Sequence, residues 1–209
     1  CAIYSDIVIE VGILSTPVID FSTNTMYLTN VNKDADTPYT VRHRLNAIDI
    51  RSGKDVLPPV VIDASVPGNG AGSVNGVLTF NPKKQSQRLA MTLVGDNVFF
   101  AFGSYCTAPP YHGWVFGYNK RTLQRTFYWC TTPNGEQGSF WHTGQGIVVD
   151  GDYLYGVTTN GAYDPSQLNF ANSFIKIDPK KQITSGPYKD MLDAMNGGVN
   201  DTFTPYNWH

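Results

Sequence analysis

Two short runs of the chain place a histidine beside large aromatic side chains. The first is Tyr111-His112-Gly113-Trp114 and the second is Phe140-Trp141-His142. Aromatic faces stack on sugar rings and other planar ligands, and an imidazole can hydrogen-bond the polar groups of such a ligand. The pattern predicts a binding site formed by Tyr111, His112, Trp114, Trp141 and His142. Packing between structural repeats is the alternative interpretation.

Other patterns that carry chemistry are incomplete. The four histidines lack the spacing of a zinc site, and no G-x-S-x-G sequence indicates a serine hydrolase. The glycine-rich run 68–76 is similar to a phosphate-binding loop, but a strand-like sequence follows it rather than a helix. The Lys-Ser or Lys-Thr that closes such a loop is also missing. We therefore expect residues 68–76 to form a flexible loop between structural repeats.

Three cysteines and one glycosylation sequon bear on the compartment. Cys106 and Cys130 each follow a predicted strand, so a disulfide between them is one expectation and two separate buried thiols are the other. Cys1 then lacks a partner, which suggests that the chain is part of something longer. Asn200-Asp201-Thr202 is a sequon for N-linked glycosylation at Asn200. These features favour a secreted, extracellular protein.

Composition excludes several classes of protein. The 209 residues carry 15 basic and 17 acidic side chains, and this balance lacks the basic field that binds nucleic acid. With 13% aromatic and only 15% charged residues, the chain is not a disordered tail. The longest run without a charged residue, 97–119, has a Pro-Pro pair in its middle. It therefore predicts two buried strands and a loop rather than a membrane span.

The elements that would position the candidate residues are short strands separated by turns. Only residues 187–195 show a helical pattern. Elsewhere β-branched and aromatic runs alternate with Gly, Pro, Asn and Asp, which predicts strands at 16–19, 25–29, 45–50, 60–62, 89–94, 98–102, 114–118, 124–129, 146–149, 153–158 and 173–177. Their order repeats, and Asp49, Asn119 and Asp178 hold equivalent positions at strand ends.

The repeat predicts an all-β fold, a β-propeller of four-stranded blades that occupies residues 1–209 as part of one domain. Blade-like repeats span approximately 11–64, 77–131 and 142–183, and residues 184–209 form a partial blade or a loop. Because propellers close with about four to eight blades, we expect three to four blades of a larger ring of about seven or eight. A small propeller completed by its own end strands is the alternative.

The stretch Ala47–Gly53 reads A-I-D-I-R-S-G. It is similar to the A-x-D-x-x-T-G signature of propeller repeats in quinoprotein alcohol dehydrogenases, which use pyrroloquinoline quinone (PQQ). The wider chain resembles secreted PQQ-like propeller proteins, and the shared segments are 10–20, 111–118, 132–135, 141–144, 159–161 and 201–205. The resemblance implies a PQQ-type propeller fold and leaves the activity open, because propellers host many unrelated functions.

The resemblance also implies a cofactor, for which this chain keeps few of the residues. The related enzymes hold PQQ over a calcium ion, between a vicinal Cys-Cys disulfide and a Trp, and a T-G-N turn supplies an amide ligand to the calcium. This chain has no Cys-Cys pair, and Thr158-Thr159-Asn160 stands in the place of that turn. Asn160 is the metal ligand if the quinoprotein interpretation holds. The other interpretation is a turn residue with positive φ before Gly161.

We therefore expect a secreted PQQ-like propeller that acts as a non-catalytic binding or structural module. Its expected ligand is a glycan or an extracellular partner, and no cofactor is expected. The alternative is a quinoprotein dehydrogenase that oxidises an alcohol or sugar with PQQ and Ca²⁺. The expected partner is the rest of the propeller, or a second copy bound through open sheet edges. Neither a nucleic-acid partner nor a membrane span is expected.

Overall fold

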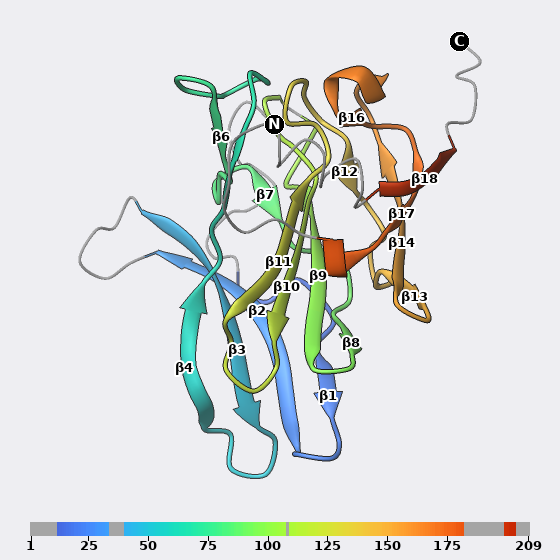
Figure 1. Cartoon of the computed structure of the whole chain (residues 1–209). Helices are drawn as coiled ribbons and strands as arrows, with labels where there is room; N and C mark the ends of the chain where they lie inside the picture. Colours follow the sequence, from blue (N-terminus) through green and yellow to red (C-terminus); the bar gives the residue numbers. More distant parts are fainter. Residues whose placement is uncertain (1–11, 34–39, 108, 182–198, 204–209) are drawn as a thin grey trace.

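Three antiparallel sheets dominate the computed structural model, which describes residues 12–33, 40–107, 109–181 and 199–203. Figure 1 shows the sheets side by side, in the order of the chain. We call them blades 1, 2 and 3. Each contains four strands that pair in the order in which they occur along the chain, so the predicted fold class, an all-β propeller of four-stranded blades, is confirmed.

The strands of the blades agree closely with the predicted pattern. Blade 1 consists of β1 (Val18–Asp20), β2 (Thr25–Lys33), β3 (Val41–Asp49) and β4 (Asp55–Val61). Blade 2 consists of β8 (Thr92–Val94), β9 (Asn97–Ser104), β10 (Trp114–Asn119) and β11 (Arg125–Cys130). Blade 3 consists of β13 (Val148–Asp150), β14 (Tyr153–Thr159), β17 (Phe174–Ile177) and β18 (Val199–Phe203). Asn200 therefore lies in the outermost strand of blade 3, within the stretch 184–209 that the sequence pattern assigns to a partial blade or a loop.

Several short elements add to the blades. β7 (Gln85–Ser86) pairs with the end of β9, and β12 (Ser139–Phe140) pairs with the end of β14, so blades 2 and 3 gain an extra strand at the same place. Two hairpins lie outside the blades: β5–β6 (Ser65–Pro67, Val77–Thr79) and β15–β16 (Tyr163–Asp164, Asn169–Phe170). There are also two 3-10 turns, η1 (Pro165–Gln167) and η2 (Pro179–Lys181). The predicted helix at 187–195 and Cys1 lie outside the described residues. No helix in the described ranges has the length and apolar character needed to cross a membrane.

Apolar clusters fill the two spaces between the blades. Because successive strand residues point to opposite faces, Phe100 and Phe102 of β9 pack between blades 1 and 2, whereas Phe99 packs between blades 2 and 3. A Cβ atom at Gly117 of β10 would lie 2.4 Å from the ring of Phe99. Only glycine fits at this position, because the Phe99 ring occupies the space that a side chain at residue 117 would need.

The blades are also joined by polar contacts. Met91 N donates to Thr16 O at 3.0 Å between blades 2 and 1, and Ala90 N donates to Gln145 O at 3.1 Å between blades 2 and 3. Lys120, in the β10–β11 turn, places Nζ 2.8 Å from Asp20 Oδ2 of blade 1, and this hydrogen bond lowers the pKa of Asp20 to about 2. Main-chain bonds near the innermost strands and an ion pair therefore reinforce the apolar contacts.

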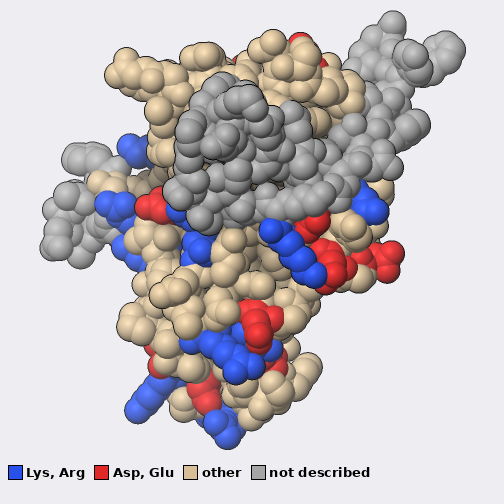
Figure 2. Space-filling model, viewed as in Figure 1, with Lys and Arg blue, Asp and Glu red and all other residues tan. Residues whose placement is uncertain are grey.

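Hydrogen-bonded loops cover one end of the molecule, the upper end in Figure 1. Gly70 N donates to Pro133 O and Ala71 N donates to Gly135 O, and a Cβ at Gly68 would lie 2.1 Å from Pro133 O. Residues 68–71 are thus held against residues 133–135 by backbone contacts, so the expectation of a flexible loop is wrong for this part of the run, whereas residues 74–76 are exposed. Figure 2 shows few charged side chains on this upper end, over β6 and β16, and a mixture of both signs lower down.

Cys106 and Cys130 are free thiols, so the predicted disulfide between them is wrong. Cys130 of β11 pairs with Trp114 of β10, which in turn pairs with Phe102 of β9. Two inter-strand spacings of about 4.8 Å therefore separate Cys130 from β9, and Cys106 lies beyond the end of that strand. A disulfide requires Cα atoms within about 7 Å, and the intervening β10 keeps the two cysteines farther apart.

We expect iodoacetamide to modify Cys106 in the native protein and to leave Cys130 unmodified until the protein is denatured. Cys130 is fully buried, and burial raises the pKa of its thiol to about 12, so the reactive thiolate is absent at neutral pH. Peptide mass spectrometry after labelling with and without urea measures both sites. A peptide pair linked by a disulfide in an unreduced digest would contradict the structure.

Candidate functional site

Of the five residues predicted to form a binding site, Trp114 lies deepest. It is fully buried in the cluster between blades 1 and 2. Its ring stacks on Phe116 at a centroid distance of 6.0 Å and meets Phe80 edge to face at 5.8 Å. The structure therefore places Trp114 in the core between two blades, in agreement with the alternative interpretation for this residue.

His112 links loops at the upper end. Its Nε2 lies 2.8 Å from the carbonyl oxygen of Ala71, and its Nδ1 lies 3.0 Å from the hydroxyl oxygen of Thr132. The side chain is buried, and this burial lowers its pKa, which favours the neutral ring. Because protein groups contact both ring nitrogens, His112 holds the loops together and has no ring nitrogen left for a ligand.

His142 lies nearer the surface. Its Nε2 accepts a hydrogen bond from Val157 N at 3.2 Å, and its ring meets Phe140 edge to face at 6.2 Å. Partial burial lowers the pKa of His142, which favours the neutral ring. Since Nε2 is the acceptor, the ring proton resides on Nδ1, for which the described part of the chain offers no partner.

Tyr111, Trp141 and Asn160 come together from three segments of the chain. The rings of Tyr111 and Trp141 meet edge to face with their centroids 6.3 Å apart. Tyr111 lies between β9 and β10, and Trp141 lies directly after β12. Asn160, directly after β14, donates from Nδ2 to the hydroxyl oxygen of Tyr111 at 3.1 Å. The structure therefore unites two predicted ligand-binding residues with the predicted metal ligand.

Arg88 completes this group, and the sequence analysis missed it. Its guanidinium carbon lies 5.7 Å from the centre of the Trp141 ring, and its Nη2 donates to Tyr105 O at 2.9 Å. None of the ion pairs among the described residues involves Arg88. One signal was present in the repeat, because Arg88 follows β7 and Trp141 follows β12 at matching places in successive blades.

We call Arg88, Tyr111, Trp141 and Asn160 the axial cluster, because residues 88 and 141 lead into the innermost strands β8 and β13. Trp141 is half-buried, and its indole N–H lacks a hydrogen-bond partner within the described ranges. The buried indole N–H groups of Trp114 and Trp129 also lack partners there, so this feature does not distinguish Trp141 from core tryptophans. The cluster thus combines a half-buried aromatic ring with a cation that forms no ion pair among the described residues.

The described residues do not fit a calcium site at Asn160. Calcium takes about 6–8 oxygen ligands, usually with several carboxylates. In the described parts of the chain, no group of three or more His, Cys, Asp or Glu side chains could hold a metal ion. Asn160 has a φ of 61° and precedes Gly161, whose φ is 90°. Its backbone is that of a turn in the left-handed region, which asparagine tolerates.

Comparison with known proteins supports the fold. No protein-family model and no curated sequence matches this chain. It is similar to the solved structure of quinohemoprotein alcohol dehydrogenase ADHIIG from Pseudomonas putida HK5, with 15% identity over 94% of this chain and 34% of that chain, and a TM-score of 0.52. A quinohemoprotein alcohol dehydrogenase from Comamonas testosteroni matches 92% of this chain and 35% of its own with 13% identity and a TM-score of 0.41. The chain spans about a third of the length of these structures, and the first similarity shows a propeller fold of the quinoprotein type.

Proposed function

We propose that this protein is a non-catalytic propeller module that binds a glycan through the axial cluster. The observation that carries the proposal is Trp141, which is half-buried and has the Arg88 guanidinium carbon 5.7 Å from the centre of its ring. Sugar-binding sites combine an aromatic surface with a few polar groups that fix orientation. Arg88 forms no ion pair among the described residues and its guanidinium favours an anionic group, so the glycan is expected to contain an acidic sugar such as a uronate.

Trp141→Ala and Arg88→Gln are each expected to weaken binding of a uronate-containing oligosaccharide by at least about tenfold, a loss of about 1.4 kcal/mol. A glycan array with neutral and uronate-containing oligosaccharides selects the probe, and calorimetric titration measures the affinity. Tyr163→Ala removes another aromatic ring at the same end of the molecule and should bind as the wild type does.

Two results would contradict this function. The first is an array on which no oligosaccharide binds, and the second is a Trp141→Ala variant that binds as tightly as the wild type. Titration with PQQ in the presence of CaCl₂ tests the dehydrogenase alternative in the same sample. A saturable change in quinone absorbance would support that alternative instead.

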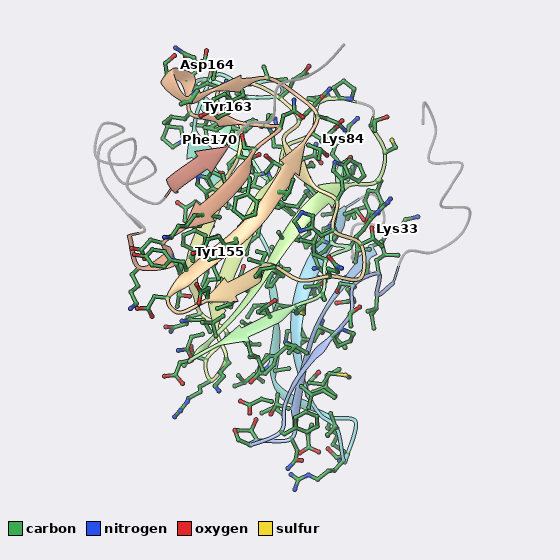
Figure 3. The ribbon with its side chains drawn as sticks, turned by 90° about the vertical axis from the view of Figure 1, so that its right-hand side faces the viewer. Lys33, Lys84, Tyr155, Tyr163, Asp164 and Phe170 are labelled. Carbon is green, nitrogen blue, oxygen red and sulfur yellow. The ribbon has the colours of Figure 1, made fainter. Side chains whose placement is uncertain are left out.

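The outward face of blade 3 indicates a partner. One pair of facing residues on the second and third strands occupies the same place in each blade. The pairs are Thr29–Leu45 in blade 1, Ala101–Val115 in blade 2 and Val157–Phe174 in blade 3. The first two pairs are at most 2% exposed because the next blade covers them, whereas Val157 is 39% and Phe174 is 47% exposed. Figure 3 turns this side toward the viewer and labels Tyr155, whose ring lies 6.1 Å from that of Phe174.

We propose that another four-stranded sheet of the same repeat covers this face. The same positions in blades 1 and 2 are already buried by such a sheet, so the exposed face continues an interface that the chain forms twice. The face also carries one cation, Lys176, whose Nζ lies 4.1 Å from the centre of the Tyr153 ring. Exposed apolar patches rimmed by polar groups mark interaction sites, and sheets bury their apolar faces against another layer. The partner face is expected to present aliphatic and aromatic side chains.

In a sample of the 209-residue chain, only a second copy can supply that sheet, so we expect concentration-dependent association in sedimentation velocity. The double variant Val157→Glu, Phe174→Glu should remain monomeric, because association would bury two carboxylates without partners. Phe21→Glu changes an equally apolar residue, 79% exposed at the β1–β2 turn, and should associate as the wild type does. A wild-type chain that stays monomeric over the whole concentration range would overturn the proposal.

A further inference from the structure

A cavity of about 340 Å³ lies between blades 1 and 2. It is lined by residues of the outer strands β4 and β11, the end of β10 and the adjoining loops, whereas the axial cluster adjoins the innermost strands. Pockets for small molecules occupy about 300–1,000 Å³, so this cavity has room for a small ligand. The residues that give it chemical character are Val60, Val61, Asp63, Tyr118, Arg125 and Tyr128.

A β-bulge turns Arg125 into this cavity. Tyr118 pairs with Arg125 and Gly117 pairs with Phe127, so Thr126 is an extra residue in β11. In a regular strand Arg125 would share a face with Phe127, which belongs to the cluster between blades 2 and 3. The bulge instead places Arg125 on the side that faces blade 1. Bulges commonly re-aim a side chain beside a functional site.

Several contacts hold Arg125 in place, and a ligand can replace one of them, the contact with the Asp63 carboxylate. Its guanidinium carbon lies 4.5 Å from the centre of the Tyr128 ring, and its Nη1 donates to the carbonyl oxygen of Asp63 and lies 3.2 Å from Asp63 Oδ1. The Asp63 side chain is 78% exposed. Because exposed ion pairs contribute only about 0–1 kcal/mol, a ligand carboxylate can displace that of Asp63 at little cost.

We propose that this cavity binds a small carboxylate with a flat apolar body. The planar guanidinium of Arg125 donates two parallel hydrogen bonds to the ligand carboxylate, a geometry that arginine favours. The apolar body lies against Val60, Val61 and the Tyr128 ring. Burial raises the pKa of Tyr118, so its phenol stays protonated beside Arg125. This proposal is independent of the glycan site at the axial cluster.

Benzoate is the probe for this cavity, and benzamide is its neutral counterpart of the same shape. In ¹H–¹⁵N spectra of the full chain, we expect benzoate to shift the amide signals of residues 60–63 and 125–128 in a saturable manner. Benzamide should leave these signals unchanged at the same concentration. Arg125→Gln is expected to weaken benzoate binding by at least about tenfold, because the charge-assisted pair is lost.

Asp63→Asn is the decisive variant. If Asp63 competes with the ligand for Arg125, its removal strengthens benzoate binding several-fold, whereas a purely structural ion pair predicts unchanged or weaker binding. This variant also decides the question if Arg125→Gln fails to fold. Equal shifts with benzamide, shifts that map away from β4 and β11, or an Asp63→Asn chain that binds benzoate no more tightly than the wild type would each overturn the proposal.

Discussion

Trp114→Ala is expected to lower the free energy of unfolding by about 3–5 kcal/mol. The indole is fully buried between blades 1 and 2, and Phe80, Phe100, Phe102 and Phe116 share its cluster. Its removal leaves a cavity that two hydrogen-bonded sheets cannot close by small movements. Since a domain is stable by only about 5–15 kcal/mol, this is a large share of the total.

Urea denaturation followed by far-ultraviolet circular dichroism measures this loss without relying on tryptophan fluorescence. Trp141→Ala is the matched control, because the same side chain is removed from a half-buried position, and a loss of about 1 kcal/mol is expected. A Trp114→Ala variant as stable as the wild type would show that Trp114 is not a core residue. The interpretation of Trp114 as a ligand contact would then regain support.

Stability is also expected to fall by about 3 kcal/mol as the pH is lowered from 6.5 to 4, because of His43. This side chain is buried against Phe80 and Phe102, and its Nε2 donates to Gln85 O at 3.0 Å and Pro82 O at 3.3 Å. Burial lowers the pKa of His43 to about 4, against about 6.5 for an unfolded chain.

The sign of the effect follows from where the proton binds. Between pH 6.5 and 4 the unfolded chain binds a proton at His43 and the folded chain does not, so protons favour unfolding. The stabilisation is complete above pH 6.5 and is lost as the pH falls toward 4. The pKa values of His112 and His142 are also lowered by burial and add to the loss, whereas Asp20, with a pKa of about 2, acts only at lower pH.

His43→Gln keeps an amide donor for the two carbonyl oxygens and removes the titrating ring. We expect the difference in unfolding free energy between pH 7 and pH 4.5 to shrink by about 2 kcal/mol in this variant. Urea titrations at a series of pH values supply the comparison. A variant whose stability falls as steeply as that of the wild type would assign the pH dependence to other groups.

The strand pattern by itself determined the fold. The predicted strands 25–29, 98–102 and 153–158 lie within β2, β9 and β14, and each is the second strand of its blade. The equivalent residues Asp49 and Asn119 end β3 and β10, and Asp178 directly follows β17. Such features are predictable because alternation of side chains and turn-forming residues act over a few neighbouring positions. Secretion, glycosylation at Asn200 and the number of blades in the ring stay predictions.

Only the tertiary structure decided which side chains can meet a ligand. Trp114 and Trp141 occur in similar aromatic and histidine-containing runs, yet the first is buried between two sheets and the second is half-buried beside Arg88. β7 and β12, with two residues each, are too short to show any period, and their pairing with β9 and β14 brings Arg88 and Trp141 to matching places. A single bulge reversed the direction of Arg125. These outcomes depend on pairing and register between segments far apart in the chain, and a local pattern of residue types contains no information about either.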